Sequence, residues 1–420
     1  MLFVFRLGAH IPTPGVDATV MNALVAQQTG GFLAFLDLFS GGALANFTIF
    51  SLGIMPYISA SIIMQLLTAV IPALEALKKE GDAGRKKITQ YTRYLTVGIC
   101  VVQSTAVTFW LKTVEMGGMA LVPNFSVGFQ ATTVITLTAG TIFLMWLGEQ
   151  MTEYGIGNGM SLLILAGIVA SLPGQIVSMF AMWKAGSLTL FAIIFFGVVL
   201  IGLTAVAVMS QQSFRKIPVQ YAQRIIGRKI YRGQSTQLPL KIDYSGVIAV
   251  IFASSVMIFP SMVAQFMERP GQTGMMAMIV DFINTWISPG QLIHTVFYMA
   301  LIIFFCYFYT AITFNPTDVA DNMKKNGGFV PGIRPGKPTA EYINSILSHI
   351  TLGGAILIVI IAVIPDLMAQ SMGVSMYFGG TTILIMVGVS LDTVQQVESH
   401  LLMRHYEGFM KSGKIKGRRG

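Results

Sequence analysis

The feature that most constrains this chain is a series of long apolar runs without charged side chains. A helix that crosses the hydrocarbon core of a bilayer needs about 20 mainly apolar residues. Nine runs of roughly this length lie at 49–71, 94–111, 129–148, 160–182, 188–209, 244–267, 292–313, 342–364 and 374–393, and the last contains Asp392 near its end. Asp, Glu, Lys and Arg make up 11% of the chain, against about 25% in soluble globular proteins. The sequence therefore predicts an all-α polytopic membrane protein.

Residues 1–7 form a further apolar stretch that is too short to cross a bilayer. We interpret it as the second half of a truncated first span, which gives ten spans in the intact protein. Ten spans can divide into two inverted halves, as in many transporters. No internal repeat is visible that would mark such halves.

Basic residues are concentrated in alternate connections between the apolar runs. Four segments hold 23 of the 27 Lys and Arg residues. They are 72–93, 210–243, 314–341 and 399–420. The opposite connections hold Lys112, Lys184 and Arg269, and Arg6 belongs to the truncated span. Because loops rich in Lys and Arg remain in the cytoplasm, we expect these four segments and the C-terminus to be cytoplasmic.

Segment 31–46 is apolar but shorter than a membrane span. It reads GFLAFLDLFSGGALAN, with Asp37 inside it and Gly41-Gly42 toward its end. An apolar stretch of about 10–14 residues is typical of a re-entrant or interfacial helix. An ordinary helix in an external loop is the alternative that these residues leave open.

The motifs of common catalytic and nucleotide-binding sites are absent from the sequence. The chain has no GxxxxGK[ST], HExxH or GxSxG pattern, its histidines are scattered, and Cys100 and Cys306 lie singly in apolar runs. The GIGNG sequence at 155–159 does not follow a strand, and we interpret it as a flexible turn before the next helix. We therefore expect no cofactor, no metal site and no reaction catalysed by the chain itself.

The centres of the apolar runs contain polar side chains but no charged ones. Examples are Ser59, Gln65, Gln103, Ser254 and Ser255, which we interpret as contacts between helices. Carriers coupled to protons or ions usually place ionisable groups at the middle of the membrane. A secondary transporter of small solutes with the same number of spans is therefore the alternative rather than the preferred function.

Five motifs together resemble one known family. They are GIMPYISASIIMQLL at 53–67, KKEGDAGRKKITQYTRY at 78–94, FLMWLGEQMTEYGIGNGMS at 143–161, FNPTDVADNMKKNGGFVPGIRPGKPT at 314–339 and YFGGTTILI at 377–385. With these motifs in order and at matching spacing, the chain resembles the bacterial SecY family of protein-translocation channels from about residue 4 to its tail.

The resemblance implies an architecture of ten spans in two inverted halves around a central pore, with a short re-entrant plug helix. The N-terminal half would cover 1–183, with the plug at about 31–46. The C-terminal half would cover 184–398, followed by a basic cytoplasmic tail at 399–420. The protein would reside in the bacterial plasma membrane.

The resemblance also assigns a ring of aliphatic side chains to the narrowest part of the pore. By motif position these are Ile54, Ile58, Met160, Ile164, Ile251 and Ile385. A narrow hydrocarbon constriction dewets and blocks ions, and it binds no particular peptide tightly. Met160 stands where isoleucine is commoner, and its flexible thioether can fill the same gap.

Two moving parts are implied by the same resemblance. Segment 31–46 corresponds to the plug, with Phe35, Leu36, Phe39, Gly41 and Gly42 as its principal residues. A lateral gate between the halves would have Ser59 on one edge and Phe259 on the other. Hydrogen bonds between helices in membranes contribute only about 0.6–2 kcal/mol, so such a seam can open when an apolar signal helix competes for it.

The basic loops would acquire a second role as a docking face. Arg334 lies in FVPGIRPG and resembles the family's arginine needed for coupling to the motor ATPase SecA, while Arg228 and Lys229 lie at a loop tip that contacts SecA or the ribosome. The resemblance further implies SecE and SecG subunits, unfolded preproteins and signal peptides as cargo, and release of signal helices into membrane lipid. The expected function is that of the passive central channel of the protein translocase.

Overall fold

A computed structural model describes most of the chain. The described residues are 1–16, 20–21, 37, 39–113, 115–116, 119–120, 122, 125–221, 224–226, 229–231, 235–267, 278, 280, 283–287, 291–371 and 379–412. Phe35, Leu36 and Arg228, which the sequence assigns to the plug and the docking face, lie outside this set. The side chain of Phe259 also lies outside it, although its backbone belongs to a helix.

The N-terminal half is built from helices of very different length. In chain order they are α1 (Leu2–Gly8), α4 (Met55–Val70), α5 (Pro72–Lys79), α6 (Asp82–Thr113), α7 (Val127–Tyr154) and α8 (Gly159–Lys184). Helices α4 and α5 are bent by 97° at a short break. Side chains cap two of these helices: Ser126 accepts from Phe129 N at the start of α7, and Asn158 accepts from Met160 N at the start of α8.

The C-terminal half is mainly helical as well. Its helices are α9 (Leu190–Gln212), α10 (Gly246–Met267), the π-helical turn η1 (Ile283–Ile287), α12 (Leu292–Thr313), α13 (Pro316–Lys325), α14 (Lys337–Ser371) and α15 (Gly380–Ser412). The predicted boundary between the halves falls at the end of α8. Several helices continue past the apolar runs: α6 begins in the basic segment 72–93, and α15 ends in the basic tail.

Short strands occupy the connections, which an all-α prediction does not include. Strand β3 (Phe214–Tyr221) pairs antiparallel with β6 (Ser235–Lys241) on one side and with β7 (Gly328–Phe329) on the other. Two smaller hairpins are β1–β2 (Glu115–Met116 with Met119–Ala120) and β4–β5 (Arg224–Ile226 with Lys229–Tyr231). The sheet β6-β3-β7 joins segments 210–243 and 314–341 into one unit.

The helix lengths support a protein that crosses the membrane many times. Among the described residues, six helices are long and apolar enough to span, namely α6 to α9, α12 with α13, and α14, and the bent pair α4–α5 makes a seventh. The predicted total of ten spans therefore remains a prediction. The run at 49–71 is not helical throughout, because residues 49–54 form turns and α4 begins only at Met55.

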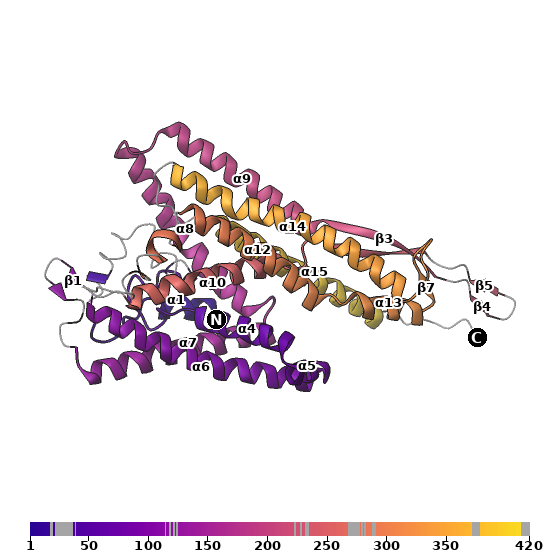
Figure 1. Cartoon of the computed structure of the whole chain (residues 1–420), viewed down its shortest axis with the longest axis horizontal. Coiled ribbons are helices and arrows are strands. Elements are labelled where there is room, and N and C mark those ends of the chain that lie inside the picture. The colour runs from indigo at the N-terminus through magenta and orange to yellow at the C-terminus, as the bar shows by residue number, and fades with distance from the viewer. Residues whose placement is uncertain are drawn as a thin grey trace.

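The two ends of the chain's helical body differ in the segments they carry. Figure 1 shows α4, α5, α6 and α7 on one side, α9, α12, α14 and α15 on the other, and α10 between them. Strand β3 extends away from the helices at the end that also carries α13 and β7, whereas β1 lies at the opposite end (Figure 1). The main hydrophobic core crosses both halves, with buried residues from α1, α4, α7 to α10, α12, α14 and α15.

Candidate functional site

The predicted aliphatic ring falls inside the main hydrophobic core. Ile54 and Ile58 come from the start of α4, Ile164 from α8, Ile251 from α10 and Ile385 from α15. All five are at most 8% exposed and belong to one contiguous cluster of buried residues. The structure therefore brings isoleucines from both halves into the same apolar core.

Met160 holds a different position from the five isoleucines. It is half-buried at the edge of the same cluster. Its side chain packs against α7, because a Cβ atom on Gly148 would stand 2.5 Å from the Met160 sulfur. Its place in the ring stays a prediction.

The C-terminal end of the predicted plug is held by polar contacts and by a close backbone approach. Asp37 accepts a hydrogen bond from Ala45 N at 2.8 Å, and Arg6 of α1 donates to the carbonyl oxygen of Gly41. Burial raises the pKa of the Asp37 carboxyl above its ordinary value, although hydrogen bonds to it act in the opposite direction. Phe39 is 4% exposed and is part of the main core.

Gly41 lies directly against α8. Its φ is +69°, and a Cβ atom there would stand 2.8 Å from the Cα atom of Gly167. A Cβ atom on Gly167 would in turn stand 3.3 Å from the Cα and N atoms of Gly41. Two facing glycines thus allow backbone contact between this segment and α8, and Gly42, at φ +85°, has no atom within 4 Å of such a position.

The edges of the predicted lateral gate are adjacent helices. Both α4 and α6 pack against α10, so the seam joins the N-terminal half to the C-terminal half. Ser59 on α4 is half-buried. On α10, Ser254 and Ser255 both donate to the carbonyl oxygen of Ile251, at 3.0 and 2.8 Å. These two hydroxyls are therefore satisfied within their own helix.

The start of α10 is fixed by an aspartate. Asp243 Oδ1 accepts from Ser245 Oγ at 2.8 Å and from Gly246 N at 2.7 Å. Burial raises the pKa of the Asp243 carboxyl above its ordinary value despite these bonds. The carboxylate caps the helix that carries Ile251.

Arg334 lies on a turn beside the small sheet. It is exposed, and its carbonyl oxygen accepts from Thr339 Oγ1 at 2.9 Å. The turn begins next to β7, whose strand partner is β3. A separate hydrophobic cluster supports this unit, with Ile217, Val219, Leu240, Met323, Val330 and Ile343 as its buried members. Lys229 belongs to β5, which pairs with β4 in a separate two-stranded hairpin.

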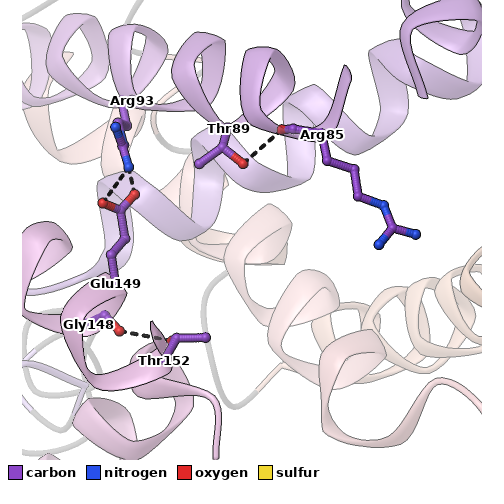
Figure 2. A network of polar contacts seen from close by, with 6 residues as sticks. All are labelled: Arg85, Thr89, Arg93, Gly148, Glu149 and Thr152. Carbon is purple, nitrogen blue, oxygen red and sulfur yellow. Dashed lines mark hydrogen bonds and ion pairs between the residues drawn. The ribbon is translucent and has the colours of Figure 1, made fainter. Parts of the chain in front are cut away.

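An ion pair between α6 and α7 was not predicted from the sequence. Arg93 Nε and Nη2 donate to the two carboxylate oxygens of Glu149, each at 2.8 Å (Figure 2). Figure 2 also shows Thr152, one turn further along α7, donating to the carbonyl of Gly148 at 2.9 Å. The only sequence signal was that both charges lie at the ends of apolar runs.

The described residues contain no group of three or more His, Cys, Asp or Glu side chains that could hold a metal ion. Cys100 and Cys306 are buried and unpaired. These findings concern the described part of the chain alone. The features that remain are an apolar core shared by both parts of the chain, a segment in which Gly41 contacts α8, and a basic end, formed by the strands and helix of segments 210–243 and 314–341.

Together these features define a class of protein: a multi-pass helical membrane protein whose main apolar core draws buried residues from the first and second parts of the chain. The SecY family model matches residues 48–394, and the chain belongs to the SecY family. It is 46% identical over 417 residues to the protein translocase subunit SecY of Escherichia coli K12, with 99% of this chain and 93% of the relative covered. A SecY subunit from Streptomyces galbus is 48% identical over 422 residues, covering 98% and 95%.

Solved structures agree with this fold. The structure described as that of a protein conducting channel matches with a TM-score of 0.66 at 19% identity, covering 96% of this chain and 90% of the other. Sec61 in the canine ribosome-channel complex matches with a TM-score of 0.62 at 17% identity, covering 96% and 90%. The fold predicted from the motifs is thereby confirmed, and the alternative of a solute transporter receives no support.

Proposed function

We propose that this chain is the central channel of a protein translocase, which passes unfolded preproteins across the membrane and releases signal helices sideways into lipid. The observation that carries the proposal is the shared core: five buried isoleucines from α4, α8, α10 and α15 belong to one cluster. The family membership supplies the context in which such a cluster acts as a pore ring.

The ring acts as a seal because of its chemistry. Ile54, Ile58, Ile164, Ile251 and Ile385, with Met160 at the edge, offer no hydrogen-bonding group to water or ions. A narrow passage lined in this way dewets. The same surface binds no side chain selectively, so chains of diverse sequence can slide through once the halves separate.

The plug would close the outer side of this ring. Its described end is seated by Gly41 against Gly167 and by the hydrogen bond from Arg6. These contacts are a hydrogen bond and a close backbone approach, and separating them would leave the hydrogen bonds within the spanning helices intact when an arriving segment displaces the plug. Phe35 and Leu36 belong to the same proposal on the strength of the motif resemblance.

The lateral gate would open between α4 and α10, with Ser59 and Phe259 at its edges. Because the Ser254 and Ser255 hydroxyls bond within α10, neither is needed for a hydrogen bond across the seam. Packing alone holds such a seam weakly in lipid, since lipid chains are as apolar as the side chains they replace. An apolar signal helix can therefore compete for it.

The basic end would face the cytoplasm of a bacterial cell and receive the partners. We propose SecE and SecG as companion subunits, SecA as the motor, and ribosomal RNA phosphates as a second ligand of the same cations. Arg334, on its turn beside the sheet, would contact SecA, and Arg228 and Lys229 would extend the docking face. Two of the solved structures with this fold are ribosome complexes, which supports the ribosome as a partner.

The test is preprotein import into liposomes that contain this chain with SecE and SecG, driven by SecA and ATP. The Arg334→Glu variant reverses one charge at the docking face, and we expect import to fall about tenfold or more, as for loss of a charged interface contact. Lys337→Glu is the control, because Lys337 is also an exposed cation, three residues away. No import by the unmodified chain, or equal loss in both variants, contradicts the proposal.

A further inference from the structure

The GIGNG turn between α7 and α8 has a partner that the sequence does not indicate. Gly157 N donates a hydrogen bond of 2.8 Å to the side-chain oxygen Oε1 of Gln396 on α15. The two residues are 239 positions apart, one in each half. Gly157 has φ +90°, a conformation that L side chains rarely adopt, and this backbone turn presents its N–H to α15.

This bond differs from other long-range polar contacts among the described residues. The hydrogen bonds from Arg6 to Gly41 and from Tyr307 to Ser348 each stay within one half. The ion pair between Arg93 and Glu149 also lies inside the N-terminal half. Gln396 therefore supplies a directional tie where the halves meet mainly by apolar packing.

The turn itself is anchored firmly to the N-terminal half. Gly159 N donates to Thr152 Oγ1 at 2.9 Å, and Thr152 in turn donates to Gly148. One residue away, Glu149 pairs with Arg93 of α6, as Figure 2 shows. Because α6 packs against α10, one of the two helices of the predicted lateral gate, the turn is connected by short polar contacts to a helix beside the gate.

On the other side, the same face of α15 carries both the tie and a ring residue. Gln396 follows Ile385 by eleven positions, which is close to three helical turns, so the two side chains project in nearly the same direction. Thr393 lies one turn before Gln396 and also contacts the turn, since a Cβ atom on Gly157 would stand 3.2 Å from Thr393 Oγ1. Helix α15 also packs against α8.

We propose that Gln396 is a positioning residue that fastens the C-terminal half to the GIGNG turn and so holds Ile385 in the closed ring. This inference rests on the proposed channel function, in which separation of the halves opens the pore. A single neutral hydrogen bond suits this role, because it biases the closed state and breaks readily when a chain enters.

The experiment compares three variants of the complete complex in liposomes. Gln396→Met removes the amide oxygen and keeps the length of the side chain. Gln396→Glu keeps an acceptor oxygen, measured in about 0.3 M salt to screen the charge of Asp392 one turn away. Gln395→Met is the matched control, because Gln395 is exposed on the same helix.

Two measurements report how far the two halves separate, and neither requires preprotein import. The first is resting halide efflux. The second is the distance between spin labels at Glu153→Cys and Glu398→Cys, both exposed, in a chain with Cys100 and Cys306 replaced by Ser. For Gln396→Met we expect a broader distance distribution and about a two- to tenfold rise in efflux, the factor that corresponds to one ordinary hydrogen bond. Gln396→Glu and Gln395→Met should match the unmodified chain.

The same hydrogen bond can also be tested by changing its donor residue, Gly157. Alanine at position 157 is strained at φ +90°, so Gly157→Ala should move the N–H away from Gln396 and give the same efflux and distances. Combined with Gln396→Met it should add nothing, because the bond is already lost. Additive effects, an unchanged Gln396→Met, or an equal effect of Gln395→Met overturn the inference. Failure of import by the unmodified chain would instead contradict the channel function.

Discussion

The close backbone contact of Gly41 with α8 gives the sharpest quantitative prediction. Replacing Gly41 with alanine introduces a methyl group 2.8 Å from the Cα atom of Gly167, a distance that real Cβ atoms essentially never show. The obstructing atom belongs to the backbone of a helix, so no side-chain rotation can relieve the clash. The segment must move, or α8 must.

Two costs combine in the Gly41→Ala variant. A non-glycine residue at φ +69° costs about 1–2 kcal/mol, and an extra methyl group in a packed site costs about 1–3 kcal/mol. A total of about 2–5 kcal/mol against the seated segment multiplies its unseated fraction by about 30 or more. Gly42→Ala is the control: its φ is +85° but no atom lies within 4 Å, so we expect only the backbone cost, about a 5- to 30-fold change.

The assay is resting halide efflux from liposomes that contain the complete complex without motor or substrate. Gly41→Ala should leak more than Gly42→Ala, and the difference should reflect the contact with α8 alone. Gly167→Ala approaches the same seam from the other side, with contacts of 3.3 Å, and should leak less than Gly41→Ala. Equal leaks from Gly41→Ala and Gly42→Ala would refute the argument, because then the close approach has no role in the seal.

Three further predictions concern the ring, the gate helix and the ion pair. Ile251→Asn places an amide in the apolar core and should hydrate the constriction, raising resting ion leak; an unchanged leak argues against Ile251 in the ring. Asp243→Ala removes the cap of α10 and should lower the free energy of unfolding by about 1–2 kcal/mol, whereas Asp243→Asn should lose less, as measured by thermal unfolding of the purified complex. Exchanging Arg93 and Glu149 should recover most of the stability lost in either single reversal, about 0.5–1 kcal/mol for a partly exposed pair; a double variant no better than the sum of the single ones shows that the pair is uncoupled.

The helical framework follows from the sequence because its cause is local. Each apolar run satisfies its own backbone groups by forming a helix, wherever the rest of the chain lies. The limits of that reasoning appear at 49–71, which is apolar throughout and yet becomes helical only at Met55. Phe47 and Gly53 adopt positive φ values, 42° and 57°, and a hydropathy pattern contains no information about such turns.

The small sheet shows a second limit. Segments 210–243 and 314–341 are polar and basic, so composition predicts loops. In the structure β3 pairs with β6 and β7, and alternate residues of β3 such as Ile217 and Val219 enter a cluster with Val330 and Ile343. The alternation covers too few residues to stand out, and β7 is only two residues long. β3 and β6 pair within 210–243, and β7 of 314–341 adds a third strand, which makes the sheet more stable than an isolated two-stranded hairpin.

The hydrogen bonds and the ion pair between helices could not be predicted from the sequence for a different reason. Arg93 and Glu149 are 56 positions apart, and Gly157 and Gln396 are 239 apart, so no periodicity connects them. Motif resemblance assigned residues to the proposed ring, but it could not indicate these contacts, which join segments that are distant in the sequence. Apolar attraction is non-directional, so a hydrogen bond defines the relative position of two helices more sharply than an aliphatic contact does. The bond from the backbone turn to Gln396 joins the two halves, whereas the bond from Arg6 to Gly41 fixes a segment within the N-terminal half. Because a single hydrogen bond contributes little net free energy, each of these contacts would break readily during opening of the proposed channel.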